Sequence, residues 1–242
     1  MIPGHRGSAP SRPTSPSHLQ RPLARALFAV ALAAVATGCG SGDDGSPANE
    51  LPACSTVKRA IVTDIDETLT TSDAELVNQL FDGTYDPKMR AGADTLMQGY
   101  SKRGYFIFYL TARVATMTLA GTGESMTDAT DEWLERHGFP MRSDRTWVAL
   151  SQENIVGRDP ATVEFKTRAI EAKMDEGYRF EFAYGNATTD IDAYENAGIA
   201  KADTFIIGKR AGDDGTTAIA EEDYLEHERS QLPAVETICA FR

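Results

Sequence analysis

Two carboxylates stand two residues apart at the end of an apolar stretch, and this spacing is suited to binding a cation. Asp64 lies near the end of the run at residues 59–65, which reads RAIVTDI, and Asp66 directly follows this run. On an ideal strand both side chains share one face, and two ionised carboxylates that close repel each other unless a cation intervenes. Mg²⁺ meets this need, because it takes about six oxygen ligands and often has a phosphate among them. The alternative is a pair of acids at a strand end, where such residues are common in turns.

Further polar side chains are predicted at the same place, because each of them follows or precedes another apolar stretch. The carboxyl ends of parallel strands meet at one edge of a sheet, where ligands of open α/β folds bind. An acid, an amide, a hydroxyl and two cations converging there form a candidate catalytic site. Besides Asp64 and Asp66, the residues of this predicted site are Thr111, Arg113, Lys166, Asn186 and Asp190.

The elements that must position these residues alternate between strands and helices. Apolar, β-branched or aromatic runs predict strands at 59–65, 105–110, 147–150, 179–184 and 204–207. Helical spacing of apolar residues predicts helices at 88–102, 125–137, 160–176, 193–196 and 218–229. Strands separated by helices indicate parallel βαβ units, so the predicted fold is α/β with a doubly wound, Rossmann-like parallel sheet.

The order of these residues resembles the motifs of the haloacid dehalogenase-like (HAD) phosphatase superfamily. D-I-D-E-T at 64–68 is similar to its first motif, Thr111 to the second, Lys166 to the third and G-N-A-T-T-D at 185–190 to the fourth. A closer resemblance is to the lipin carboxy-terminal domain, also called the LNS2 domain, which some phosphatidylinositol-transfer proteins share. The pieces that carry it are DIDETLTTSD (64–73), YLTAR (109–113), WLERHG (133–138), FK (165–166) and GNATTDIDAYENAG (185–198).

The resemblance implies a Mg²⁺-dependent phosphomonoesterase that works through an aspartyl phosphate. It makes Asp64 the nucleophile and Asp66 the general acid and base, with the backbone carbonyl of Asp66 on the metal. Asn186 and Asp190 are the further metal ligands that it implies, the latter directly or through water. Thr111 and Lys166 would hold the phosphoryl oxygens, and Thr68 would orient the loop of the first motif.

Two residues near these motifs have roles that the sequence leaves open or assigns locally. Arg113 is placed to bind phosphate or to form a salt bridge with an acid of a loop. Asp192 is expected to cap the helix that follows the fourth motif.

Two features of the sequence bear on the substrate. Glu67 stands where lipins have Gly, and the D-E-T form also occurs in secreted, lipid-anchored bacterial acid phosphatases. About 45 residues separate the first and second motifs and about 55 the second and third, which leaves no room for a large cap domain. An open site would suit a bulky substrate or a phosphorylated lipid head group such as phosphatidate. Three alternatives therefore remain: a phosphatidate phosphatase, a broad-specificity acid phosphatase, and a module that binds phosphatidate without cleaving it.

The amino terminus is predicted to direct export. Residues 1–38 combine a basic segment, the short apolar run ALFAVALAAVA at 26–36 and small residues, as a signal peptide does. The sequence ATGC at 36–39 resembles a bacterial lipobox, which would make Cys39 a lipidated first residue. Residues 39–53 would then form a flexible linker, with the HAD-like domain at 54–242. This organisation predicts a protein anchored by lipid to the outside of a bacterial cell membrane or in the periplasm.

Charge and cysteine content add two expectations. The chain has a net charge of −12, and a surplus of acids argues against nucleic acid as a partner. Of the three cysteines, Cys54 and Cys239 lie near the two ends of the predicted domain, and export would permit a disulfide between them. Two free thiols are the alternative.

Overall fold

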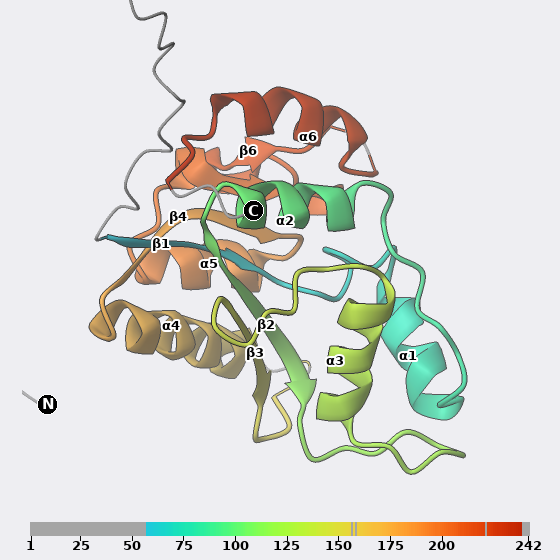
Figure 1. Ribbon diagram of the computed structural model, residues 1–242. Helices are drawn as coiled ribbons and strands as arrows, with labels where there is room; N and C mark the ends of the chain where they lie inside the picture. Colours follow the sequence, from blue (N-terminus) through green and yellow to red (C-terminus); the bar gives the residue numbers. More distant parts are fainter. Residues whose placement is uncertain (1–56, 156, 158, 221, 239–242) are drawn as a thin grey trace, which may run out of the picture. The chain divides into compact units, whose positions relative to one another are not determined.

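A computed structural model describes residues 57–238 of the chain, except residues 156, 158 and 221. The described part is an α/β domain built on one six-stranded parallel sheet with the strand order β3-β2-β1-β4-β5-β6 (Figure 1). The strands are β1 (Lys58–Thr63), β2 (Phe106–Val114), β3 (Thr146–Ser151), β4 (Tyr178–Gly185), β5 (Thr204–Ile206) and β6 (Thr217–Ala218).

Strand β1 lies between β2 and β4, because it is apolar on both faces. Ala60, Ile61, Val62 and Thr63 are fully buried. A central strand of a parallel sheet is covered on both sides, and this favours a continuous apolar run over an alternating one. The chain segment that follows β1 is therefore flanked by the segments that follow β2 and β4, which brings three of the sequence motifs to one edge of the sheet.

Helices cover both faces of the sheet (Figure 1). One face packs against the cluster that includes Leu96, Tyr100 and Trp133, and the other against the cluster that includes Ile170 and Tyr194. The helices are α2 (Ala93–Lys102), α3 (Met126–Arg136) and α6 (Leu225–Gln231) on the first face, and α4 (Asp159–Asp175) and α5 (Thr188–Asn196) on the second.

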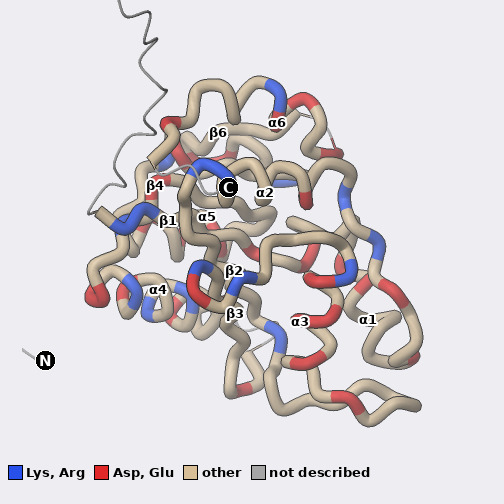
Figure 2. Tube along the Cα trace, viewed as in Figure 1, with Lys and Arg blue, Asp and Glu red and all other residues tan. Residues whose placement is uncertain are grey.

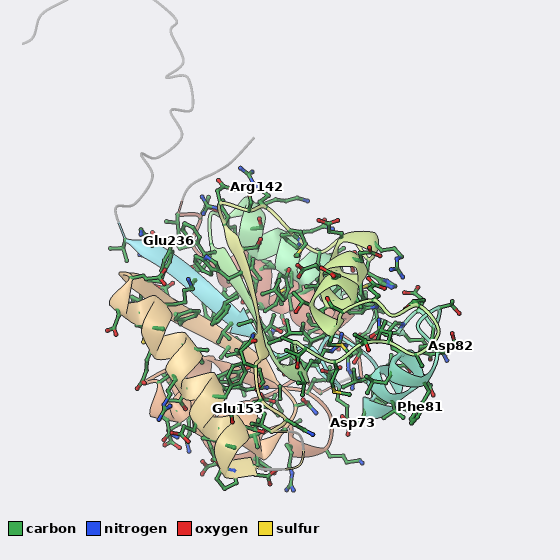
Figure 3. The ribbon with its side chains drawn as sticks, turned by 90° about the horizontal axis from the view of Figure 1, so that it is seen from below. Asp73, Phe81, Asp82, Arg142, Glu153 and Glu236 are labelled. Carbon is green, nitrogen blue, oxygen red and sulfur yellow. The ribbon has the colours of Figure 1, made fainter. Side chains whose placement is uncertain are left out.

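A further helix, α1 (Asp73–Phe81), directly follows the first motif. It packs through Leu76 and Leu80 against a small cluster that contains Leu119 and Met126. Figure 3 shows Asp73 and Phe81 projecting from this helix, and the Phe81 side chain is 80% exposed. The sequence did not predict α1.

The structure differs from the predicted elements mainly at the carboxyl end. A helix was expected over 218–229, but the chain forms the short strand β6 and then α6. The first residues of the expected helix contain Ile219, which is buried in the core, and a contact with β5 overrides the polar helical pattern there. The other predicted strands and helices are present, with ends shifted by a few residues.

The described part contains no inserted cap domain. Only α1 and α2 lie between β1 and β2, and only α3, β3 and α4 lie between β2 and β4. Among the described residues, no helix is long and apolar enough to span a membrane. Figure 2 shows acidic residues along α3 and both signs of charge along α4.

Candidate active site

The loop after β1 is anchored to the neighbouring strand β4. The backbone N–H of Asp64 donates to the carbonyl of Tyr184 over 3.0 Å, which extends the pairing of β1 with β4 by one residue. The chain then turns, and the N–H groups of Leu69 and Thr70 both donate to the carbonyl of Ile65. This turn places the side chains of the first motif at the carboxyl edge of the sheet.

Lys166 joins two carboxylates that come from different strand ends. Its ammonium lies 2.6 Å from Oδ1 of Asp64 and 2.6 Å from Oδ1 of Asp190. All three side chains are buried, and helix α4 supplies the lysine from beneath the loops. One cation between two anions is the arrangement that makes burial of all three tolerable.

The protonation of this group is governed by burial and by its internal charges. Burial raises the pKa of Asp64 to about 7, although the charge of Lys166 opposes the rise and that of Asp190 adds to it. Burial alone would lower the pKa of Lys166, but the carboxylates of Asp190 and Asp64 outweigh it and raise that pKa. Lys166 is therefore a fixed cation, and Asp64 is the group that titrates near neutral pH.

Asp66 is held in a separate set of contacts. Arg113 donates from Nε to Asp66 Oδ2 over 3.0 Å and from Nη2 to Oδ1 over 2.8 Å, and Thr111 Oγ1 donates to Oδ2 over 3.0 Å. Burial would raise the pKa of Asp66, but the charge and hydrogen bonds of Arg113 and the Thr111 hydroxyl hold it below its usual range. Asp66 is therefore an ionised carboxylate in this arrangement.

Arg113 makes one of the two contacts that the sequence left open, and its binding of phosphate stays a prediction. Its guanidinium is buried, and it also donates to Thr130 Oγ1 over 3.0 Å. Of the two alternatives, phosphate binding or a salt bridge to an acid, the structure shows the salt bridge.

Thr68, Asn186 and Asp190 complete the site. Thr68 Oγ1 lies 3.0 Å from both Asp64 Oδ2 and Asn186 Oδ1. Asp190 Oδ2 accepts the backbone N–H groups of Asn186 and Ala187 over 3.0 and 3.1 Å. Asp190 thus binds both the backbone of the loop before α5 and the ammonium of Lys166. The expectation that Asp192 caps this helix is wrong, because Asp192 lies exposed within α5.

The donor atoms suit a hard cation, although the carboxylates do not form a cluster. Carboxylate and amide oxygens of Asp64 and Asn186 meet at Thr68, and such oxygens are the ligands that Mg²⁺ takes. In the described part of the chain, no three His, Cys, Asp or Glu side chains gather closely enough to hold a metal ion. A magnesium site here would therefore depend on the amide oxygen of Asn186 and on backbone carbonyl as well as on carboxylates.

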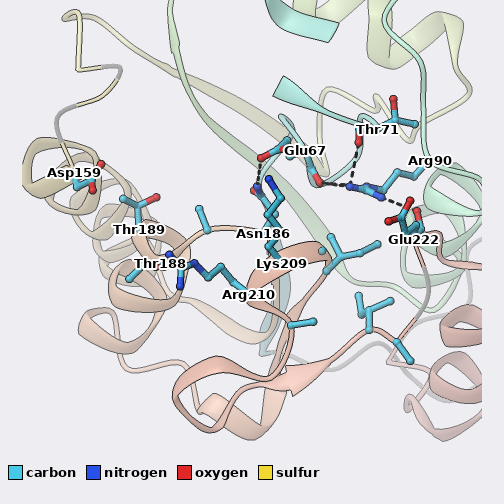
Figure 4. Close-up of a pocket in the computed structure, with 16 residues that line it drawn as sticks. Glu67, Thr71, Arg90, Asp159, Asn186, Thr188, Thr189, Lys209, Arg210 and Glu222 are labelled. Carbon is cyan, nitrogen blue, oxygen red and sulfur yellow. Dashed lines mark hydrogen bonds between the residues drawn. The ribbon is translucent and has the colours of Figure 1, made fainter. Parts of the chain in front are cut away.

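A cavity of about 700 Å³ opens beside the site (Figure 4). Glu67 and Asn186 form part of its wall, and Lys209 and Arg210 line it from the loop after β5. Asp64 itself is only 5% exposed. The site is thus free of a cap domain, yet its nucleophile candidate Asp64 is buried beside the cavity.

The sequence found most of these residues and missed two. Glu67 was noted only as a departure from lipins, and Arg90 was not singled out, yet Arg90 donates to the carbonyl of Glu67 and Glu67 accepts from Asn186. Arg90 lies in a segment expected to be helical, and no motif marks it. Three residues singled out in the sequence, Cys39, Cys54 and Cys239, lie outside the described residues and stay predictions.

Comparisons with known proteins bear on this arrangement. Over residues 61–208 the chain matches the family model described as the LNS2 domain of PITM 1-3. It is 28% identical over 125 residues to Protein retinal degeneration B of Drosophila melanogaster, a match that covers 51% of this chain and 8% of that protein. The chain therefore spans a small part of this curated relative.

Solved structures give weaker likenesses. A D,D-heptose 1.7-bisphosphate phosphatase from B. bronchiseptica, complexed with magnesium and phosphate, has a TM-score of 0.49 and 12% identity, covering 73% of this chain and 99% of that one. The Class C acid phosphatase from Bacillus anthracis has a TM-score of 0.37 and 17% identity, covering 56% of this chain and 54% of that one. The family match, by contrast, takes in the first motif, the second and third motifs and the loop before α5. The chain belongs to the LNS2 domain family.

Proposed function

We propose that this LNS2 domain is a Mg²⁺-dependent phosphomonoesterase that forms an aspartyl phosphate on Asp64. The observation that carries the proposal is the arrangement of Asp64, which contacts Lys166 through Oδ1 and Thr68 through Oδ2 and lies beside the separately held Asp66. A carboxylate nucleophile, a fixed cation and an adjacent acid or base are the parts that covalent phosphoryl transfer needs.

The first step uses Asp64 as the nucleophile. An oxygen of its carboxylate attacks phosphorus, a phosphorus–oxygen bond to Asp64 forms, and the bond to the leaving alcohol breaks. The leaving oxygen takes a proton from the Asp66 carboxyl group, so that a neutral alcohol departs. Because Arg113 favours the ionised form of Asp66, this carboxyl must take up a proton before the step.

The second step uses Asp66 as a base. The ionised Asp66 accepts a proton from a water molecule, whose oxygen attacks phosphorus and releases inorganic phosphate and the free Asp64 carboxylate. The contacts of Arg113 and Thr111 suit this step, since they stabilise an Asp66 carboxylate that is ready to accept a proton. A positioned acid or base of this kind accelerates a reaction by roughly 10²–10⁴-fold.

Binding of the phosphoryl group would replace hydrogen bonds that residues of the site now make to one another. Lys166 and Thr111 are proposed to hold phosphoryl oxygens, and both now donate to carboxylates that the substrate would adjoin. Asp64, the carbonyl of Asp66, Asn186 and Asp190 are the residues that would hold Mg²⁺. When bound, the cation would neutralise charge on the phosphoryl oxygens.

The proposed substrate is phosphatidate or a related phosphorylated head group at a membrane surface. The missing cap and the adjoining cavity support a bulky leaving group. The net charge of −12 works against an anionic surface, by an amount that salt screens. A broad-specificity acid phosphatase would instead prefer small esters.

A second candidate, binding of phosphatidate without cleavage, has its own support. Asp64 is buried, and both of its carboxylate oxygens already have protein partners. A site that never exchanges these partners would retain lipid and release nothing.

The experiment measures inorganic phosphate released by the full chain in detergent. Phosphatidate in mixed micelles and a small aryl phosphate are compared, each with Mg²⁺ and with a chelator. Asp64→Asn is the inactive reference, and Asp192→Asn, an exposed change of the same type, is the matched control. Release from phosphatidate that requires Mg²⁺ and Asp64 supports the proposal. Faster release from the aryl ester favours the acid phosphatase, and retained lipid without release favours the binding module.

Export and anchoring are proposed from the sequence alone. We propose that residues 1–38 are removed and that Cys39 carries lipid, which intact mass spectrometry of the wild-type and Cys39→Ser proteins would test. A Cys54–Cys239 disulfide is proposed on the same basis. Non-reducing peptide mapping would test it, and recovery of two free thiols would reject it.

A further inference from the structure

Glu67 has a backbone conformation that side-chain-bearing residues seldom adopt. Its φ is +55°, in the left-handed region, and Asp214 is the other non-glycine residue with positive φ in the described part. Glycine would adopt this conformation without a steric penalty, whereas a residue with a Cβ is held there only by its surroundings. Residues of this kind gather at functional sites, so the contacts of Glu67 bear on what it does.

Arg90 holds the turn in this shape. It donates from Nε and Nη2 to the backbone carbonyl of Glu67 over 3.1 and 3.0 Å, and from Nη2 to the carbonyl of Thr71 over 3.2 Å. Its third nitrogen, Nη1, donates to the carbonyl of Glu222 over 2.6 Å (Figure 4). The guanidinium is buried and thus ties the loop after β1 to the segment before α6.

The side chain of Glu67 extends from this turn to Asn186. Glu67 Oε2 accepts from Asn186 Nδ2 over 3.1 Å, as the dashed line in Figure 4 shows. On its other side, Asn186 Oδ1 accepts from Thr68 Oγ1, which lies equally close to Asp64 Oδ2. The amide therefore has its nitrogen toward Glu67 and its oxygen toward the nucleophile.

This orientation depends on the charge of Glu67. Thr68 can accept or donate a hydrogen bond, so by itself it fits either end of the amide. A carboxylate only accepts, so a turned amide would place Oδ1 against the anionic Oε2 and lose a hydrogen bond. Glu67 is thus the neighbour that distinguishes the two orientations.

We propose that Glu67 is a positioning residue that keeps the amide oxygen of Asn186 facing Asp64. The inference rests on the proposed function, because that oxygen is one of the proposed Mg²⁺ ligands. Glu67 acts through its hydrogen bond with Asn186. The left-handed backbone is the conformation from which its carboxylate reaches the amide.

The test compares Glu67→Gly with Glu67→Gln. Glycine removes the steric penalty of the left-handed backbone and also removes the carboxylate that accepts from Asn186. Glutamine keeps an acceptor oxygen but has no charge. Mg²⁺ binding to the full chain is measured by titration calorimetry without substrate. We expect Glu67→Gly to bind Mg²⁺ at least fivefold more weakly while its metal-free melting temperature stays equal or rises. Glu67→Gln should not restore the affinity, because its amide can donate as well as accept and therefore fits either orientation of Asn186. Glu222→Gln is the matched control, because its side chain lines the same cavity and only its backbone contacts Arg90.

A second readout separates this inference from the proposed function. The side-chain amide protons of Asn186, followed by NMR in the metal-free protein, should exchange slowly in the wild type and faster in Glu67→Gly. If no variant binds Mg²⁺ and no ester is cleaved, the proposed function fails and the NMR comparison still tests whether Glu67 holds the Asn186 amide. Wild-type Mg²⁺ affinity in Glu67→Gly, or an unchanged Asn186 signal, would overturn the inference.

Discussion

The ammonium of Lys166 lies 2.6 Å from Oδ1 of Asp64, although the two residues are 102 positions apart in the chain. Both side chains are buried, and the same ammonium reaches Asp190. A buried ion pair contributes little net stability, but removing one partner leaves the other charge uncompensated. The site therefore combines high sensitivity to mutation with little stabilising effect of its own.

Replacing Lys166 with Met should destabilise the protein strongly at neutral pH. The loss leaves two buried carboxylates without a counter-charge, which costs about 3–5 kcal/mol. The penalty should shrink toward pH 5, because Asp64 already has a raised pKa and takes up a proton more readily still when the lysine is gone. Denaturant unfolding at pH 5 and pH 8 measures both values.

Arg168→Met is the control on the same helix. Arg168 pairs with Glu164 on the exposed side of α4, where such a pair contributes about 0–1 kcal/mol. An equal effect of the two substitutions would show that the Lys166 carboxylate contacts do not form in solution.

Asp64→Asn should stabilise the folded protein in a pH-dependent way. Burial raises the pKa of Asp64 to about 7, against about 4 in an unfolded chain. Between these values the folded state binds more protons than the unfolded state, so the wild-type carboxyl lowers stability progressively as pH rises from about 4 to about 7. Asparagine has no such dependence.

The difference in folding stability between Asp64→Asn and the wild type should therefore grow by roughly 2–4 kcal/mol between pH 4 and pH 7, and level off above pH 7. Melting temperatures of both proteins from pH 4 to pH 8 give the comparison, with Asp192→Asn as an exposed reference. A difference that stays flat across the range would mean that Asp64 has an ordinary pKa.

Arg113→Met should move the alkaline limb of the kcat/KM profile to higher pH. Arg113 holds the pKa of Asp66 below its usual range, and burial raises that pKa once the guanidinium is absent. Asp66 would then keep the proton that it donates to the leaving oxygen up to a higher pH. The pH dependence of kcat/KM on an aryl phosphate measures the change.

Arg113→Lys separates charge from geometry in this experiment. Lysine restores a cation but not the two-point contact with the carboxylate, so it should give an intermediate profile. An alkaline limb unchanged in both variants would rule out Asp66 as the proton donor of the first step.

Gly185→Ala should impair the site through Asp190. Gly185 ends β4, and a Cβ there would lie 2.5 Å from Cβ and 2.7 Å from Cγ of Asp190. Asp190 cannot move without losing Lys166 and the N–H groups of Asn186 and Ala187. We expect at least a tenfold loss of kcat, measured as phosphate release.

Gly99→Ala is a matched change in a helix. Its Cβ would meet the end of the Leu232 side chain, which can rotate away, so stability should fall while kcat is kept. Equal losses of kcat in the two variants would indicate a general effect on folding.

The sequence predicted the central elements because each depends on a local pattern. The β1 run is apolar throughout, and the acids and the amide directly follow strands, so parallel pairing alone brings Asp64 and Asn186 together. The parallel sheet and the missing cap are confirmed, and Lys166 contacts Asp64 as the motifs suggested, but the sheet has a sixth strand that the sequence did not predict.

What the sequence could not predict depends on contacts between distant segments. The polar pattern at 218–229 gave no sign of the pairing between β5 and β6. The sequence assigned the helix cap to Asp192, whereas the observed helix begins earlier and Asp190 accepts the N–H groups of the loop before it. The left-handed backbone of Glu67 depends on Arg90, which is 23 positions further along the chain.

The two tryptophans of the chain lie in different layers of the domain. Trp133 belongs to α3, is fully buried and donates its indole N–H to the carbonyl of Pro87, whereas Trp147 packs with Phe106 and Tyr178 on the opposite face of the sheet. Each layer thus has its own intrinsic fluorophore. Emission from single-tryptophan variants would report the loosening of one layer at a time, and it would show whether the two halves of the core melt together.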